Sequence, residues 1–311
     1  MKPFRFGVNV VRAGSRQEWA DKARKVEDLG YSVLGVPDHL TEMLAPIPAV
    51  LAAALATTRL RVGTGVLNND FRHPLLLARE AATVDLLTDG RLELGLGAGY
   101  VQSEYDQAGL GYDRGATRVS RLGETVVLLK RLFAGEPVSF AGEHYRVTGH
   151  TLWPLPIQRP RPPILIGGSG PRLLTLAATE ADIVGLTGIT FRRGGTAPDI
   201  SAWKASVVDE RVELLKNAAG ERFGQLELNA LVQRVIVTDD RRRAAEELAR
   251  ERWSQLTVED ILETPYALIG AVDELVQNLL ARRERWGISY YLVHEPYLDA
   301  LAPVVARLAG K

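Results

Sequence analysis

Two histidines and a tyrosine stand directly after apolar segments of this chain, and side chains of these types can exchange protons with a ligand. His39 follows Asp38 at the end of one such segment, and His294 ends the last one. A neutral imidazole accepts or donates a proton near neutral pH, and a neighbouring carboxylate can fix its tautomer. We take His39 as the first candidate for proton transfer, with Tyr100 and His294 as alternates. A structural interpretation also stays open, in which Asp38 caps a helix and His39 faces solvent.

Residues 164–174 (ILIGGSGPRLL) combine a short apolar segment with the features of an anion site. Gly167, Gly168 and Ser169 follow the apolar residues, and Pro171 stands where a helix would begin. Proline suits the first helical position, and the free N–H groups at a helix start attract anions such as phosphate. A tight strand-to-helix turn without a ligand would explain the same residues, so both interpretations stay open.

Two further segments carry glycines where a core strand would not need them. Residues 59–74 (RLRVGTGVLNNDFRHP) begin like a buried strand, but Gly63 and Gly65 interrupt it. Glycine loses much backbone entropy on ordering and offers no side chain for packing. Residues 92–100 (LELGLGAGY) lack the third glycine of a dinucleotide-binding fingerprint. We interpret this second segment as a strand whose backbone runs close to a flat group.

Composition excludes several classes of function. The chain has no cysteine, so disulfides, thiolate nucleophiles and cysteine-based metal sites are excluded. Its five histidines are scattered, and no spacing resembles a metal site. Lysine plus arginine equal aspartate plus glutamate at 38 each, so charge does not indicate nucleic acid or a membrane surface as a partner. No run reaches the roughly 18 apolar residues of a membrane span, and we expect a cytoplasmic protein.

The elements that position these residues repeat one unit, in which a helical segment ends at glycine and a short apolar strand follows. The pairs ARKVEDLG–YSVLGVPDH and ATVDLLTDG–RLELGLGAG show this pattern. Eight such strands alternate with helices over 311 residues, which predicts an α/β fold, a (β/α)8 TIM barrel forming a single domain over residues 1–311. We expect insertions after strand 4 (residues 135–163) and after strand 6 (residues 190–200). The predicted strands cover residues 4–10, 32–37, 60–67, 92–96, 164–167, 183–186, 228–237 and 290–293.

Three stretches resemble the luciferase-like monooxygenase superfamily of flavin- and deazaflavin-dependent barrels. They are GVPDHL, the block from LRVGTG to GLGAGY, and ILIGGSGPRLLTLAATEADIVGL, which together span most of residues 33–186. Within the superfamily the chain looks most like the branch that uses coenzyme F420, an 8-hydroxy-5-deazaflavin. The resemblance implies hydride transfer to or from a small organic substrate, and relatives of this kind are usually homodimers.

The resemblance also implies roles for individual residues. The strand Thr64–Gly65–Val66 would lie behind the deazaflavin ring, with a non-prolyl cis peptide between Gly65 and Val66. Backbone of residues 97–99 would lie near the ring, and residues 167–169 would receive the cofactor phosphate. The implied cofactor-binding residues are Asp38, Thr64, Gly65, Val66, Gly97, Ala98, Gly99, Gly167, Gly168 and Ser169.

Departures from the family pattern leave the substrate open. Sugar-phosphate dehydrogenases of the F420 branch have glutamate where this chain has Tyr100 and tryptophan where it has Met43, which argues against glucose-6-phosphate as substrate. Two alternatives remain, an FMN-dependent monooxygenase that activates O₂ and a flavin-binding barrel without catalysis. Arg72, Arg192 and Arg193 are candidates for screening an anionic cofactor tail, although each could be an ordinary solvated arginine.

Overall fold

Eight parallel strands form a closed barrel in the part of the chain that the computed structural model describes, residues 1–187, 190–191 and 198–311. They follow one another around the barrel in sequence order, and pairing of β3 with β5 closes it. The predicted (β/α)8 barrel is therefore confirmed. Its strands are β1 (Arg5–Asn9), β2 (Val33–Val36), β3 (Arg61–Thr64), β5 (Leu92–Gly97), β8 (Ile164–Gly168), β9 (Ile183–Leu186), β12 (Glu227–Leu231) and β15 (Ile288–His294).

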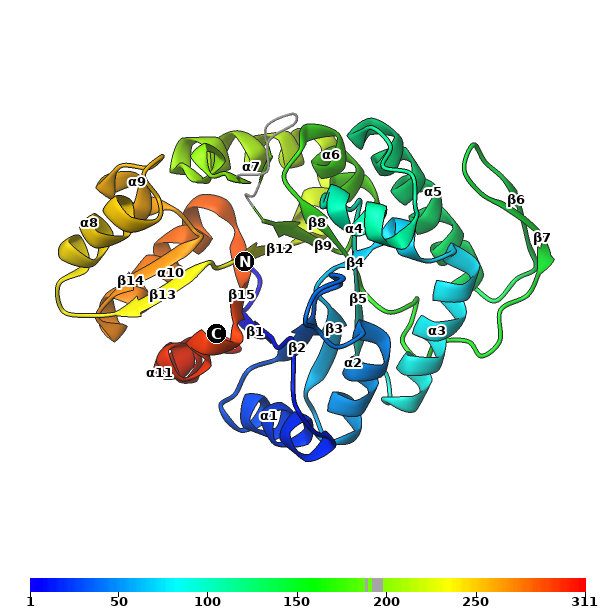
Figure 1. Ribbon diagram of the computed structural model, residues 1–311, viewed down its shortest axis with the longest axis horizontal. Helices are drawn as coiled ribbons and strands as arrows, with labels where there is room; N and C mark the ends of the chain where they lie inside the picture. Colours follow the sequence, from blue (N-terminus) through cyan, green and yellow to red (C-terminus); the bar gives the residue numbers. More distant parts are fainter. Residues whose placement is uncertain (188–189, 192–197) are drawn as a thin grey trace.

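Helices surround the barrel strands (Figure 1). Gly30, Gly90 and Gly287 follow three of them with φ of 82°, 75° and 75°, which confirms the helix-ending glycines of the repeating unit. All six positions of β5 are buried, as expected for a parallel strand covered by helices. The helices are α1 (Arg16–Asp28), α2 (Pro46–Leu55), α3 (Pro74–Leu87), α4 (Gln102–Ala108), α5 (Gly115–Phe133), α6 (Pro171–Glu180), α7 (Ala205–Ala219), α8 (Arg241–Glu251), α9 (Val258–Glu263), α10 (Val272–Trp286) and α11 (Leu298–Leu308), with 3-10 turns η1 (Asn69–Phe71), η2 (Ser201–Trp203), η3 (Gly220–Gln225) and η4 (Glu295–Tyr297).

The first predicted insertion contains an antiparallel hairpin, β6 (Val138–Ala141) and β7 (Arg146–His150). Figure 1 shows it at one edge of the molecule. The second insertion contains the short pair β10 (Thr190–Phe191) and β11 (Pro198–Asp199). Arg192 and Arg193, the two candidates for screening an anionic tail, lie outside the described residues.

The predicted seventh strand, residues 228–237, is too long and divides in two. The N–H of Val232 still donates to Leu292 of the barrel, at 2.8 Å, but that of Gln233 donates to the carbonyl of Tyr266 at 2.8 Å. Beyond this point β13 (Arg234–Val237) pairs with β14 (Ala267–Gly270) in a separate two-stranded sheet. The polar pair Gln233–Arg234 interrupts the apolar run at this division, and the prediction of one strand overlooked it.

Ion pairs connect the N-terminal parts of several barrel strands. Glu93 contacts Arg5 at 2.5 Å and Arg61 at 2.7 Å, and Arg5 also contacts Glu227 at 3.0 Å. The opposite ends of the strands carry the polar residues and glycines singled out from the sequence. Among the described residues, no helix combines the length and the apolar character needed to cross a membrane.

Candidate functional site

The third barrel strand bulges near its C-terminal end. Gly63 pairs with Glu93 of β5, whereas Leu67 of the short strand β4 (Leu67–Asn68) pairs with Leu96. The third strand therefore has one residue more than β5 between these two pairs, which is the arrangement of a β-bulge. The strand predicted over residues 60–67 is thus divided into β3 and β4.

The bulge contains Gly65, whose missing side chain makes room for Asn9. The peptide bond between Gly65 and Val66 is cis, as the family resemblance implies. A Cβ atom at Gly65 would lie 2.7 Å from Oδ1 of Asn9, and one at Gly35 would also collide with this oxygen. Asn9 is 3% exposed, and its Oδ1 has no hydrogen-bond partner among the described residues. The side-chain amide of Asn9 therefore leaves no room for a larger residue than glycine at positions 35 and 65.

The side chain of Val66 fills the space that three other glycines leave open. Cβ atoms at Gly95, Gly97 and Gly167 would lie 3.1, 2.8 and 3.2 Å from its methyl groups. Residue 66 thus stands against a wall of bare backbone from β5 and β8. These glycines therefore make room for Val66, and the deazaflavin that the resemblance implies would lie against the bulge rather than against this wall.

Thr64 connects the bulged strand to β5. Its hydroxyl donates to the carbonyl of Gly95 and accepts from the N–H of the same residue, both at 2.8 Å. Because both hydrogen bonds of this hydroxyl go to Gly95, Thr64 would contact a cofactor through its backbone and not through its side chain.

His39 and Tyr100, two of the predicted catalytic residues, lie together at the mouth. The Tyr100 hydroxyl is 3.5 Å from Nε2 of His39, and the rings meet edge to face with centroids 5.7 Å apart. Burial and the negative charge of Glu104 raise the pKa of Tyr100, so its hydroxyl keeps its proton at neutral pH. Nδ1 of His39 lies 2.9 Å from Oε1 of Glu104, a residue that the sequence did not single out.

Asp38 holds the loop that follows the bulge. Its carboxylate contacts Arg72 at 2.5 and 3.3 Å and accepts from the N–H of Asn68 at 3.1 Å. Asp38 is 7% exposed. Arg72, a third candidate for screening an anionic tail, therefore has its charge balanced by Asp38.

The backbone of residues 97–99 is held from behind by two side chains. The Tyr105 hydroxyl lies 3.4 Å from the carbonyl of Ala98, and Arg118 donates to the carbonyls of Ala98 and Gly99 at 3.2 and 3.3 Å. Gly99 has φ of 73°, and a Cβ atom there would collide with the Tyr105 hydroxyl. These contacts fix the loop next to His39 and Tyr100.

The glycine-rich loop after β8 leads into α6 as the sequence predicted. Pro171 is its first helical residue, and Gly170 caps it without a side-chain hydrogen bond. A Cβ atom at Gly168 would collide with Leu173, so this glycine is needed for packing the helix onto its strand. Among the described residues, nothing lies within 4 Å of a Cβ atom at Gly170, so no described side chain blocks an anion from the start of α6. Ser169 is half-buried beside it.

His294 ends β15, which β1 separates from β2 in the barrel. Burial and the positive charge of Arg234 lower the pKa of His294, which keeps its imidazole neutral at pH 7. Arg234 donates to the Tyr297 hydroxyl at 2.5 Å. His294 thus belongs to a second polar group at the mouth, on the opposite side of β1 from His39.

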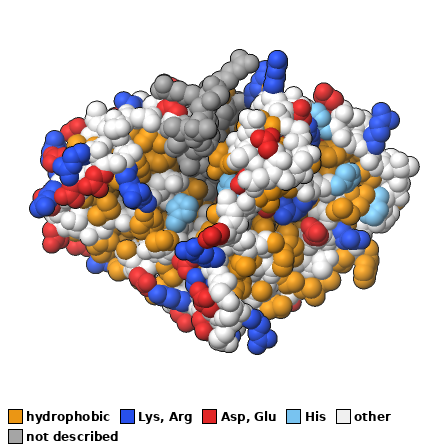
Figure 2. Space-filling view, viewed as in Figure 1, with side chains coloured by type: hydrophobic (Ala, Val, Ile, Leu, Met, Phe, Trp, Pro, Cys, Tyr) orange, Lys and Arg blue, Asp and Glu red, His pale blue; other side chains and the backbone are white. Residues whose placement is uncertain are grey.

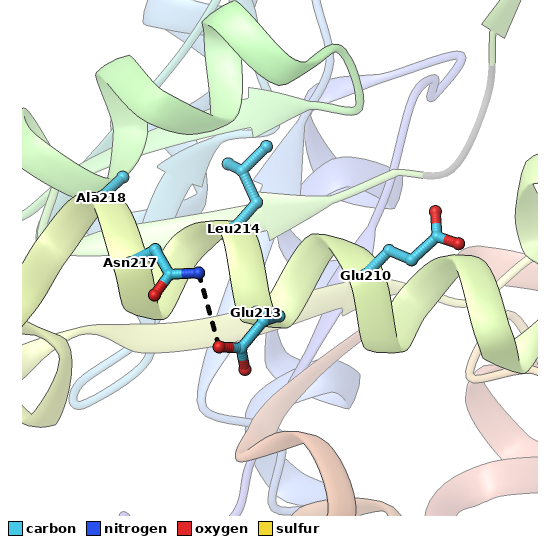
Figure 3. Close-up of a pocket in the computed structure, with 5 residues that line it drawn as sticks. All are labelled: Glu210, Glu213, Leu214, Asn217 and Ala218. Atoms are coloured by element: carbon cyan, nitrogen blue, oxygen red, sulfur yellow. Dashed lines mark hydrogen bonds between the residues drawn. The ribbon is translucent and has the colours of Figure 1, made fainter.

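A narrow cavity of about 60 Å³ lies inside the barrel below these residues. Its walls include Gly65, Val66, Gly95, Gly167 and Asn229, so the bulge and the bare backbone around it face an open space. A wider hollow lies on the outer face of α7, where its described lining residues are Glu210, Glu213, Leu214, Asn217 and Ala218 (Figure 3). Among the described residues, the outer hollow shares none with the barrel mouth. Among the described residues, no group of three or more acidic or histidine side chains could hold a metal ion.

Comparison with known proteins agrees with the barrel fold. The luciferase-like monooxygenase family matches residues 1–288, and the chain therefore belongs to this family. An F420-dependent glucose-6-phosphate dehydrogenase from Nakamurella multipartita is 32% identical over 303 residues, covering 92% of this chain and 84% of the relative. A 4-hydroxyprotoasukamycin monooxygenase from Streptomyces nodosus subsp. asukaensis is 26% identical and covers 90% and 79%. The structure of an F420-dependent tetrahydromethanopterin reductase from Methanopyrus kandleri superposes with a TM-score of 0.78 at 18% identity, over 99% of this chain and 98% of that one.

Proposed function

We propose that this chain is an F420-dependent oxidoreductase that transfers hydride between the deazaflavin and a small organic substrate. The bulge at Gly65 and Val66, which packs on backbone without side chains and has His39 and Tyr100 near it at the barrel mouth, is the observation that carries the proposal. The 32% identical F420-dependent relative, aligned over most of both chains, supports the choice of cofactor. When bound, F420 supplies the hydride chemistry, and the protein supplies binding, orientation and proton transfer.

The residues that would hold the cofactor lie along one arc of the barrel mouth. Backbone of Thr64, Gly65 and Val66 forms the bulge, and backbone of Gly97, Ala98 and Gly99 forms the adjacent loop. The start of α6, with Gly167, Gly168 and Ser169, would receive the phosphate through its free N–H groups. Asp38 would act by holding the loop after the bulge and by facing the ring edge.

His39 is the proposed proton donor and acceptor, because its Nε2 faces Tyr100 and the mouth while its Nδ1 is held by Glu104. Tyr100 keeps its proton and can donate it in a hydrogen bond to His39 or to a ligand. His294 remains an alternate on the other side of β1. The substrate is a small molecule whose identity these residues leave open.

An FMN-dependent monooxygenase is the second candidate, supported by the 26% identical monooxygenase from Streptomyces. The same bulge and the same helix start would suit either phosphate-bearing ring. A flavin-binding barrel without catalysis is the third candidate, and the polar residues at the mouth argue against it. The cofactor itself separates the first two, because reduced FMN reacts readily with O₂ whereas reduced F420 hardly does.

Fluorescence titration of the purified chain with F420 and with FMN tests the proposal. We expect F420 to bind at least tenfold more tightly, and redox turnover of bound F420 with at least one member of a panel of alcohols, aldehydes and sugar phosphates. Tight binding of FMN without binding of F420 would overturn the proposal in favour of the monooxygenase. Binding of F420 without turnover across the panel would favour the barrel without catalysis.

Two variants of Gly170 test the phosphate loop. Gly170→Asp places a negative charge at the start of α6 without removing a contact, and aspartate is a favourable residue at a helix cap. We expect it to weaken F420 binding at least tenfold. Gly170→Ala, which adds a methyl group in open space, should change the affinity less than twofold. Equal affinities of the two variants would place the phosphate elsewhere.

We also propose that two copies of the chain form a homodimer. Leucines of α2 and α3 are exposed, with 68% for Leu55, 49% for Leu76 and 52% for Leu87. Figure 2 shows hydrophobic side chains gathered on the lower right of the molecule, where Figure 1 places these helices. Light scattering should give twice the chain mass for the parent and a monomer for Leu87→Glu. The cytoplasmic location expected from the sequence stays a prediction, which fractionation of the native host would test.

A further inference from the structure

Glu104 is a buried carboxylate whose hydrogen bonds point at the segment containing His39. Its Oε1 lies 2.9 Å from Nδ1 of His39 and accepts from the N–H of Leu40 at 3.2 Å. The Glu104 side chain is 6% exposed, whereas that of His39 is 26% exposed. An ionised carboxylate only accepts hydrogen bonds, so this contact places the hydrogen of a neutral imidazole on Nδ1.

Tyr100 completes a line that runs from the buried carboxylate to the mouth. Nε2 of His39 carries the free lone pair when Nδ1 holds the hydrogen, and the Tyr100 hydroxyl lies 3.5 Å from it. A tyrosine hydroxyl carries a proton at neutral pH and Nε2 then has only a lone pair, so Tyr100 is the donor and Nε2 the acceptor. A substrate hydroxyl that displaced Tyr100 from Nε2 would meet the same acceptor.

We propose that Glu104 is a positioning residue, which fixes the tautomer and orientation of His39 and balances its charge after it takes a proton. The inference rests on the proposed function, because it assigns the proton transfer to His39. In substrate oxidation, one proton moves from the substrate hydroxyl oxygen to Nε2, and the two electrons leave with the hydride that the proposed function assigns to the cofactor. Glu104 accepts the Nδ1 hydrogen before and after the transfer, as in other acid–base pairs of this kind.

A purely structural role for Glu104 makes a different prediction. Glu104 stands in the first turn of α4, where a negative charge stabilises a helix, and it also satisfies the N–H of Leu40. If these were its only roles, its substitution would lower stability and leave the tautomer of His39 unchanged. The test therefore needs a measurement on the imidazole itself.

Nitrogen NMR of protein labelled at its histidines provides that measurement without cofactor or substrate. We expect the Nδ1–H tautomer at His39 in the parent, with the signals assigned by their loss in His39→Asn. In Glu104→Ala no acceptor faces Nδ1, so the Nε2–H tautomer should appear. Glu274→Ala is the matched control, because Glu274 also stands in a first helical turn, where it accepts from the N–H of Ala271 at 2.9 Å. A parent with the Nε2–H tautomer at His39 would overturn the inference without any variant.

Kinetics with F420 and the best substrate of the panel give the second readout. We expect Glu104→Gln to lower kcat at least tenfold while KM and the F420 dissociation constant stay within twofold. Glu104→Asp should restore part of the loss, and Glu104→Gln should add nothing in a His39→Asn background. Additive losses would overturn the inference. Failure of F420 to bind, with the tautomer as expected, would instead overturn the proposed function and leave the positioning of His39 standing.

Discussion

Replacing Asp38 by asparagine should destabilise the protein whether or not a cofactor is bound. Asp38 is 7% exposed and accepts three hydrogen bonds, two from Arg72 and one from the N–H of Asn68. Removing one partner of a fully buried ion pair costs about 3–5 kcal/mol. The Arg72 side chain is 23% exposed, so water can solvate its charge once Asp38 is replaced. We therefore expect the free energy of unfolding to fall by about 2 kcal/mol, close to the value of one charge-assisted hydrogen bond.

Urea unfolding of Asp38→Asn, Arg72→Gln and the double variant measures this cost. We expect a lower midpoint at an unchanged m-value for each single variant, and a double variant no less stable than the worse single one, because the pair acts as a unit. Asp299→Asn is the control, since it removes an ion pair with Lys25 in which the side chains are 72% and 50% exposed. A midpoint for Asp38→Asn as high as that of the control, together with weaker F420 binding, would refute the structural role and make Asp38 a ligand contact.

Two further predictions concern the loop after β5 and the second polar group at the mouth. Gly99→Ala should destabilise the protein much more than Gly109→Ala in urea unfolding, because both glycines have a positive φ but only Gly99 faces the Tyr105 hydroxyl; equal losses would exclude the collision. His294 has a lowered pKa in the folded state, so unfolding takes up a proton as pH falls below the unfolded value of 6.5 and stability declines there. Unfolding midpoints between pH 7.5 and 5.5 should therefore fall less in His294→Gln than in the parent, and equal falls would show that Arg234 and burial do not hold this imidazole neutral.

The sequence predicted the barrel well because its signals are local. A compact apolar run marks most of the strands, a glycine ends the helix before β2, β5 and β15, and neither feature depends on distant partners. The prediction of one strand over residues 228–237 was wrong because apolar residues stand on both sides of Gln233 and Arg234, and the polar pair that marks the division was overlooked.

The site was predicted in part, and the missing part consists of contacts between distant segments. His39 and Glu104 are 65 residues apart, and Asp38 and Arg72 are 34 apart. Glu104 has an ordinary local explanation as an acidic residue in a first helical turn, so no local pattern distinguishes it. One signal was available, because the C-terminal ends of neighbouring parallel strands converge at the barrel mouth. A glutamate just after such an end could have been considered together with His39.

The loss of stability caused by a substitution at each glycine around the bulge should depend on the atom that faces it. At Gly97 that atom belongs to the side chain of Val66. A Cβ atom at Gly97 would lie 2.8 Å from a methyl group of Val66, while its next contacts, at 3.7 and 3.8 Å, are ordinary. Gly97→Ala should therefore destabilise the protein, and adding Val66→Ala should recover much of the loss because it removes that methyl group. Gly95 is the control, since a Cβ atom there would collide with the backbone carbonyl of Thr64, which no side-chain substitution moves. Urea midpoints of the single and double variants test this, and rescue of Gly95→Ala by Val66→Ala would contradict the geometry from which the proposed ring site is built.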